Sequence, residues 1–309
     1  MANKYWVWWS WNWSDAVNHW ATSSWWTPWS ATLPTSADDV FFDSASHTTD
    51  YTVTRNATQN VRSLSVVAPA SWNMTFTWNN VMLFYWNFHL YSWIILSWTW
   101  QFIGSATSWN WTINTNGVPL ITNVALTWAW WTWTLTWNFV GTWFTQSNSS
   151  FLTWWFNVTL SGWFSNNTTA TRTLNLSTST ITCSSFTIDT TNLNLTSSQS
   201  KIIFSSSFYA GYLWGSPWAQ FDEITLDKTT VVATNNIQWN ITCNKFSVIN
   251  NTIAFTILFL SGTYTYSFWE FNVSGVPWWL ITINSSNVGL THNLVKTTPW
   301  YINCNYLDI

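Results

Sequence analysis

The chain has 309 residues, of which 6% are charged, and its formal net charge is −3. So low a charged fraction excludes coiled coils, charged linkers and most helical bundles, and 8 basic residues against 11 acidic ones give no basic footprint for nucleic acid. No apolar run reaches the roughly 18 residues needed to span a bilayer, so we expect no membrane insertion. Abundant Thr, Val, Ile, Phe and Tyr favour strands.

Residues 1–50 form the first predicted element, an N-terminal cap. The segment is rich in acidic residues and contains a Pro/Ser-rich stretch, and the terminal unit of a stacked array must be atypical to cover the open end. Residues 1–20 lack a basic stretch followed by an aliphatic core, so we expect no secretory signal. Asp38, Asp39 and Asp43 are weak candidates for Ca²⁺ ligands. The EF-hand pattern is absent, and a solvated cap turn is the favoured interpretation.

Tryptophan is unusually frequent, with 33 residues against 9 glycines. Many of these residues stand where turns are expected, as in 8–12, 25–29 and 127–133, and glycine at those positions would give ordinary turn chemistry. We therefore predict that the gene uses UGA for glycine and has been read with UGA as tryptophan. Trp6, Trp13 and Trp20 are expected to be genuine. The alternative is a truly Trp-rich chain, whose exposed indoles would favour aggregation.

Residues 51–309 carry repeats. An apolar pattern with corner spacing starts at five almost evenly spaced positions: Val61, Ile121, Cys183, Cys243 and Cys304. Side chains of a strand alternate with period two, so the three-residue step from Cys183 to Phe186 requires a corner at Ser184-Ser185. The pattern predicts an all-β, single-stranded, parallel, right-handed β-helix (β-solenoid) with about 20 residues per coil and three coils for each step of the pattern. A β-sandwich is the alternative fold.

Two expectations follow from this register. Apolar residues should stack in ladders such as Phe186/Phe246/Leu307, and the three cysteines should form one row as buried thiols about 14 Å apart, too far for disulfides. The chain stops inside a repeat, so we expect that its C-terminus is truncated.

Catalytic chemistry has one weak candidate, the carboxylates Asp222, Glu223 and Asp227. Paired carboxylates on a β-helix can cleave polysaccharide, but Ile224 and Leu226 indicate a core strand with Glu223 facing outwards. The four histidines lack metal-ligand spacing, and we predict no metal and no cofactor. Two motifs that arise only after recoding, at 214–218 and 128–133, are interpreted as turns, because Pro217 lacks the N–H of a nucleophile elbow and no helix follows the second motif.

A family resemblance emerges from both ends of the chain. With Trp8, Trp9 and Trp11 read as glycine, residues 5–20 together with 34–43 resemble the opening of Gly/Ser/Thr-rich β-helix proteins of phage and metagenomic sequences. Residues 280–286 and 301–309 are similar to their final segment, and 132–138 is similar to autotransporter-type β-helix repeats. The resemblance implies a surface or virion structural role, such as a tail-associated fibre, and no catalytic residues.

The leading hypothesis is a non-enzymatic, ligand-presenting β-solenoid of a phage particle, located on the virion or in the extracellular space. Its expected partners are host surface glycans or other virion proteins, and a homotrimer is a plausible assembly. A bacterial adhesin of the autotransporter kind is the second hypothesis. A polysaccharide lyase or hydrolase that uses Asp222 and Glu223 is the third.

Overall fold

A computed structural model describes the protein in segments. They comprise residues 2–7, 10–15, 19–24, 31–45, 49–56, 58–66, 73–78, 82–85, 87–91, 94–98, 102–104, 110–127, 131–205, 212–214, 219–227, 234–238, 240–249, 254–259, 264–275, 281–285, 293–296, 302–303 and 307–308. The chain forms two compact units, Met1–Phe151 and Leu152–Ile309.

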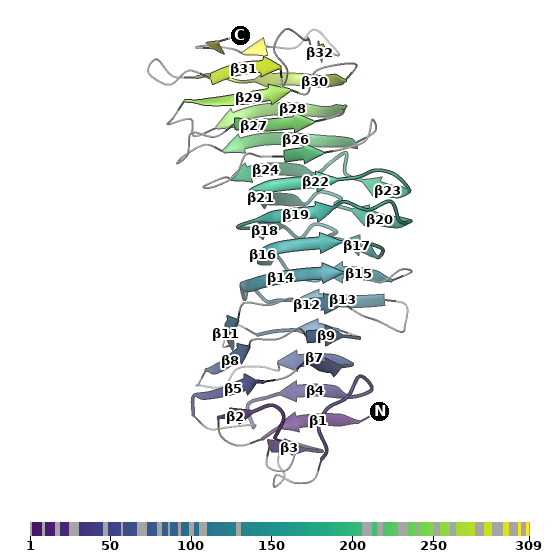
Figure 1. The fold of residues 1–309 in the computed structure, drawn as a ribbon, viewed down its shortest axis with the longest axis vertical. Helices are drawn as coiled ribbons and strands as arrows, with labels where there is room; N and C mark the ends of the chain where they lie inside the picture. Colours follow the sequence, from purple (N-terminus) through teal and green to yellow (C-terminus); the bar gives the residue numbers. More distant parts are fainter. Residues whose placement is uncertain are drawn as a thin grey trace. The chain divides into compact units, whose positions relative to one another are not determined.

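The fold is a β-solenoid, as the sequence predicts. All elements given for the described segments, β1 to β34, are strands, and successive coils place their strands side by side in parallel sheets (Figure 1). In strands such as β5 and β29, the residues of one face are buried and the alternate residues are partly or fully exposed. The described segments contain no helix long and apolar enough to cross a membrane.

Three successive coils of the first unit have three strands each. One coil holds β4 (Asp39–Phe42), β5 (Tyr51–Arg55) and β6 (Gln59–Val61); the next holds β7 (Ser63–Val66), β8 (Met74–Trp78) and β9 (Met82–Phe84); the third holds β10 (Phe88–His89), β11 (Ile94–Trp98) and β12 (Phe102–Gly104). Each strand pairs in parallel with its counterpart in the next coil. The unit continues with β13 (Asn110–Asn114), β14 (Leu120–Leu126), β15 (Thr132–Leu135), β16 (Phe139–Gln146) and the start of β17 (Ser150–Leu152).

Parallel stacking already begins within the segment predicted as a cap. Strand β1 (Asn3–Trp6) pairs in parallel with β4, and β2 (Trp11–Asn12) pairs in parallel with β5. Strand β3 (Trp20–Ala21) runs antiparallel to β1. Trp6, Trp13 and Trp20 are fully buried here and pack with one another and with Phe42. The start of the stack is therefore closed by aromatic side chains.

The strands of the second unit form two long columns. Within a column, each strand pairs in parallel with its counterpart in the next coil. The first column contains β18 (Val158–Leu160), β21 (Thr180–Cys183), β24 (Lys201–Ser205), β26 (Ala219–Asp227), β28 (Ile241–Ile249) and β30 (Thr265–Asn272), followed by β32 (Asn293–Lys296) and β33 (Ile302–Asn303). The second contains β19 (Trp163–Asn166), β22 (Ser185–Ile188), β25 (Tyr212–Trp214), β27 (Thr234–Gln238), β29 (Phe255–Phe259), β31 (Ile281–Ser285) and β34 (Leu307–Asp308). Strands β20 (Arg172–Asn175) and β23 (Leu193–Thr196) pair beside them.

The coil length differs from the one that the cysteine spacing suggests. Equivalent positions in successive coils are occupied by Ile181, Ile202, Ile224, Phe246 and Phe271. The number of residues from one such position to the next is the coil length, and it is larger between Phe246 and Phe271 than between Ile181 and Ile202. The sequence predicts three coils between Cys183 and Cys243, so each coil should take one third of that spacing. Every observed coil is longer than this. Three coils therefore take up more of the chain than one cysteine spacing, and residues separated by that spacing fall at different points of their coils.

The predicted ladder Phe186/Phe246/Leu307 is consequently wrong. Phe186 lies in register with Leu213, Phe246 with Ile224, and Leu307 with Ile281. The predicted cysteine row is wrong for the same reason. Cys183 lies opposite Phe204, whereas Cys243 lies between Phe221 and Phe268. Cys304 lies outside the described residues.

The corner at Ser184-Ser185 is confirmed. Strand β21 ends at Cys183 and β22 begins at Ser185, and all four side chains from Cys183 to Phe186 are buried. The Ser184 N–H donates to the carbonyl of Gly162, one coil earlier. The break in alternation thus occurs where the chain turns from the strand column of β21 to that of β22.

Several coils share a tight turn. Val118 N–H donates to the carbonyl of Thr115, Phe156 N–H to that of Thr153, and Ser179 N–H to that of Leu176. The residue after the accepting one has positive φ each time: Asn116 at 46°, Trp154 at 57° and Ser177 at 45°. Asparagine tolerates this left-handed region, whereas a bulky side chain is strained in it.

Most tryptophans in the described part of the chain are either buried or exposed. The exposed ones are Trp11, Trp137, Trp143, Trp154, Trp155, Trp163 and Trp269. Trp111 and Trp133 are buried like the three in the first coils, and they face each other on β13 and β15. Burial therefore distinguishes the three tryptophans that we expect to be genuine, Trp6, Trp13 and Trp20, from the exposed tryptophans. It does not distinguish them from Trp111 and Trp133.

Candidate functional site

The acidic residues Asp222 and Glu223 lie at a corner of β26. Phe221 and Ile224 are both buried, so the two acidic residues between them occupy the outer side of the bend. This is the same three-residue step as at the Ser184 corner. Leu226 is buried as well, which confirms the prediction that this segment is a core strand.

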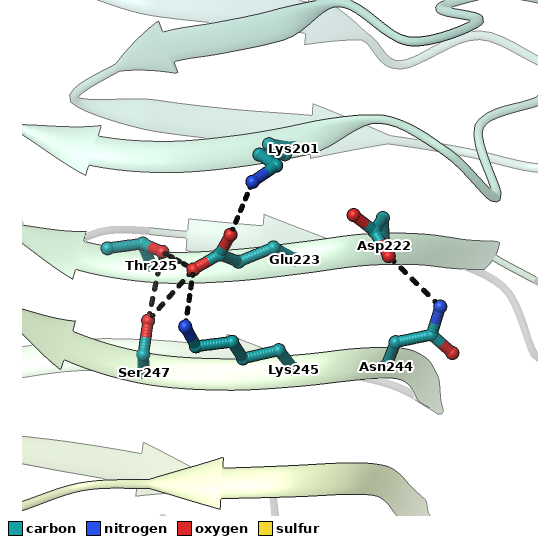
Figure 2. Close-up of polar contacts among 7 residues, drawn as sticks. All are labelled: Lys201, Asp222, Glu223, Thr225, Asn244, Lys245 and Ser247. Atoms are coloured by element: carbon teal, nitrogen blue, oxygen red, sulfur yellow. Dashed lines mark hydrogen bonds and ion pairs between the residues drawn. The ribbon is translucent and has the colours of Figure 1, made fainter.

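Two lysines from the neighbouring coils converge on Glu223 (Figure 2). Lys201 on β24 donates from Nζ to Oε2 of Glu223 at 2.9 Å, and Nζ of Lys245 on β28 lies 3.5 Å from Oε1. The carboxylate side chain is 17% exposed, and the lysine side chains are 46% and 38% exposed. Glu223 therefore joins three successive coils through one half-buried carboxylate.

Two hydroxyls complete the surroundings of Glu223. Thr225 Oγ1 donates to Oε1 at 3.1 Å, Ser247 Oγ lies 3.3 Å from the same oxygen, and the two hydroxyls are 3.0 Å apart. Thr225 and Ser247 are both buried although they lie on the outer side of the strand. Both oxygens of the carboxylate thus have partners within the protein.

The other two candidate carboxylates lie on either side of Glu223 along β26. Asp222 accepts a hydrogen bond of 3.0 Å from Nδ2 of Asn244 on the next coil. Asp227 lies at the far end of the strand, in register with Ser205 and Ile249. The structure brings Asp222 and Glu223 to one corner and leaves Asp227 four residues away.

The electrostatics favour an ionised Glu223. Burial opposes ionisation, but the hydrogen bond and charge of Lys201, the charge of Lys245 and the Thr225 hydroxyl outweigh it and lower the pKa of Glu223. In return, the hydrogen bond and charge of Glu223 raise the pKa of Lys201. A general acid needs the opposite shift, towards neutral pH, so this carboxylate suits an ion-pair role better than proton donation.

The three candidate Ca²⁺ ligands serve separate local contacts. Asp38 is buried and accepts hydrogen bonds from the N–H groups of Ala2 and Thr35 and from the Thr35 hydroxyl, which also lower its pKa against the opposing effect of burial. It is therefore not the solvated turn residue that the sequence suggests.

Asp39 forms an ion pair with Arg62 and accepts a hydrogen bond from Ser63, and Asp43 accepts one from the N–H of Ala45. Within the described segments, no group of three or more His, Cys, Asp or Glu side chains is arranged to hold a metal ion.

The described cysteines and histidines are buried or half-buried. Burial raises the pKa of the Cys183 and Cys243 thiols and lowers the pKa of His89. Burial likewise lowers the pKa of His19, although the Val7 carbonyl and Asp15 oppose it. Buried neutral thiols are unreactive, so the cysteines act as apolar core residues. His47 and His292 lie outside the described residues, as does 215–218, which holds most of the recoded elbow motif.

Arg172 is a buried residue that the sequence interpretation missed. Its guanidinium donates to the Asn166 side chain and to the carbonyls of Asn166, Ala170, Asp189 and Thr191. These acceptors lie at the end of β19 and in the loops of two successive coils. A basic residue isolated in a Ser/Thr/Asn-rich tract is the only signal in the sequence, and it does not identify the acceptors, since four of the five are backbone carbonyls.

Comparisons with protein-family models, with curated proteins and with solved structures find no match to this chain. Function is therefore inferred from the fold and from the contacts described above.

Proposed function

We propose that the protein is a non-enzymatic structural β-solenoid that presents a hydroxyl-rich face to host surface glycans as a tail-associated component of a phage particle. The stacked coils form the scaffold. Solenoids offer extended faces for binding because each coil repeats the same outward positions.

The observation that carries this proposal is a face of aligned threonines on β5 and β8, which we call the threonine face: Thr52, Thr54, Thr75 and Thr77. Thr52 lies in register with Thr75, and Thr54 with Thr77. The Thr77 hydroxyl lies 3.1 Å from that of Thr54. Thr54 is exposed and the other three are half-buried.

Such a face suits a neutral sugar. Each hydroxyl both donates and accepts hydrogen bonds, as sugar hydroxyls do, and the two paired strands hold their threonines about 4.8 Å apart. The engagement of Glu223 by two lysines and two hydroxyls supports the non-enzymatic part of the proposal, because the candidate catalytic carboxylate already has partners.

The test is binding of the purified protein to host surface polysaccharide, with valine at all four positions of the threonine face. Valine keeps the shape of threonine and removes the hydroxyl, so we expect a fold with unchanged β circular dichroism and a loss of affinity of about tenfold or more. A matched control, Asp222→Asn combined with Glu223→Gln, should retain binding.

Two outcomes would contradict the proposal. Unchanged binding by the valine variant would remove the threonine face from recognition. Release of sugar from the polysaccharide, abolished by Asp222→Asn, would establish the hydrolase or lyase instead. Peptides of this chain in purified virions are expected, whereas their recovery from bacterial cell surfaces alone would favour an adhesin.

A further inference from the structure

Four consecutive coils of the second unit carry charges of alternating sign at one position. Lys201 on β24 lies in Cα register with Glu223 on β26, Glu223 with Lys245 on β28, and Lys245 with Glu270 on β30. We call these four residues the charge ladder. Figure 2 shows its first three rungs, with the Glu223 carboxylate between the two ammonium groups.

The apolar interior cannot by itself determine which coil stacks on which. The inward positions next to the ladder are Ile202, Ile224, Phe246 and Phe271, and all are buried and apolar. A coil that skipped its neighbour and stacked on the next one would still bury apolar side chains. Burial is non-directional, so a further interaction is needed to distinguish these arrangements.

We propose that the charge ladder determines the order in which the coils β24, β26, β28 and β30 stack. Adjacent coils present opposite charges at this position. Omission of one coil would place Lys201 opposite Lys245, or Glu223 opposite Glu270. Like charges directly opposite each other on neighbouring strands are destabilising, so the correct order is favoured and the skipped order is penalised.

Glu223 is the central positioning residue of the ladder. Isolated surface ion pairs contribute little, and both lysines are substantially exposed. Glu223 differs because it is more buried, contacts both lysines and accepts from the hydroxyls of Thr225 and Ser247. Glu270 extends the alternation by one coil, and its carboxylate accepts a hydrogen bond from Asn272.

Engineered cysteine pairs test the order directly. Ser205, Asp227 and Ile249 are in register on three successive coils. Neighbouring strands are about 4.8 Å apart and next-nearest strands about twice that, and a disulfide requires Cα atoms within about 7 Å. After refolding and mild oxidation, Ser205→Cys/Asp227→Cys should therefore form the crosslink, and Ser205→Cys/Ile249→Cys should not.

The ladder is then altered in the background of each cysteine pair. Glu223→Lys gives three lysines in a row, and we expect the skipped crosslink between positions 205 and 249 to increase at least about threefold. An inverted ladder, Lys201→Glu/Glu223→Lys/Lys245→Glu/Glu270→Lys, has the wild-type net charge and restores alternation. It should return the crosslinks to the wild-type pattern. Glu223→Gln keeps the shape of the side chain without its charge and should give an intermediate result.

Hydrogen exchange of the β26 and β28 amides provides a second measurement, which also covers a variant that refolds poorly. Glu223→Lys should accelerate exchange about tenfold, and the inverted ladder should remove most of that effect. An inverted ladder that crosslinks and exchanges like Glu223→Lys would overturn the proposal, as would a Glu223→Lys variant indistinguishable from the wild type.

Discussion

Trp154 combines a left-handed backbone conformation with a bulky side chain. It has a φ of 57° and an exposed side chain, and it follows Thr153 just as Asn116 follows Thr115 in the equivalent turn. We propose that glycine stands here in the natural protein, in line with the reading of UGA as glycine.

The first prediction is that Trp154→Gly stabilises the protein by about 1 kcal/mol, because glycine adopts positive φ without the strain that a side chain brings. The measurement is the midpoint of urea unfolding. Trp163→Gly is the matched control: Trp163 is also exposed but lies in strand β19, where glycine should lower stability by about 0.5–1 kcal/mol.

Equal effects of the two substitutions would contradict the turn argument. Peptide mass spectrometry of the protein from its natural host tests the residue itself, and tryptophan at position 154 would end the recoding hypothesis there. Sequence composition suggests the substitution, but only the backbone conformation separates Trp154 from a tryptophan in a strand.

His19 is a titratable residue of the first coils whose pKa is shifted by burial. It is buried, its ring stacks on Trp6 with centroids 5.1 Å apart, and burial lowers its pKa below 6.5 despite the Val7 carbonyl and Asp15. The unfolded chain then binds more protons than the folded one. The stability that neutral His19 contributes is present above about pH 6.5 and is lost as the pH falls through the folded pKa.

We therefore expect hydrogen exchange in β1 to accelerate between pH 7 and pH 5, after correction for the intrinsic pH dependence of exchange. His19→Phe keeps an aromatic ring against Trp6 and removes the titrating group, so its β1 amides should lose this additional acceleration. Persistence of the effect in His19→Phe would assign it to another group.

Among the elements, the corners between β19 and β20 and between β22 and β23 depend on Arg172. The guanidinium satisfies carbonyls from both loops, and Nη1 alone reaches Ala170 at 2.8 Å and Thr191 at 3.0 Å. Arg172→Met keeps an unbranched, apolar stem and removes every donor. We predict a loss of about 3 kcal/mol in unfolding free energy, because buried carbonyls would lose their partners.

Arg172→Lys distinguishes geometry from charge. Lysine keeps the positive charge but lacks the planar fork of five donors, so most of the loss should remain. A lysine variant as stable as the wild type would show that charge alone is sufficient. The same urea unfolding measurement serves both variants.

The sequence predicts the elements better than their register. Alternating apolar residues identify β21, β22 and β26, and the three-residue steps at Cys183 and Phe221 identify their corners, because burial on one face leaves a local pattern. Register depends on coil length, which is larger between Phe246 and Phe271 than between Ile181 and Ile202. The even spacing of the three similar cysteine motifs therefore does not correspond to a whole number of coils.

The candidate site shows the same division. Asp222 and Glu223 are visible in the sequence as an acidic pair, and their outward position follows from Phe221 and Ile224. Their partners are not visible, because Lys201 and Lys245 lie far from Glu223 along the chain and become its neighbours only through the coil step.

At the scale of the whole molecule, the strands of a column pair with strands of the adjoining coils. Each coil should therefore be stabilised by its immediate neighbours. Phe246 is fully buried and lies against Phe268 and Phe271 of the following coil, with centroids 5.2 and 5.4 Å away. Phe246→Ala leaves a cavity that should cost about 3–5 kcal/mol. In a stacked array, this loss should accelerate hydrogen exchange in β26, β28 and β30 and leave β4, β7 and β10 of the first unit unchanged.

Phe76→Ala is the reciprocal experiment, because Phe76 is buried on β8 of the first unit and pairs with Val53 and Leu96 of the adjoining coils. It should accelerate exchange in β5, β8 and β11 while β26 and β28 keep wild-type rates. Uniform acceleration in both units by either variant would mean that the chain unfolds as one cooperative body. The two localised responses together would instead establish that stability is distributed coil by coil, because each apolar residue contacts only the coils that adjoin its own.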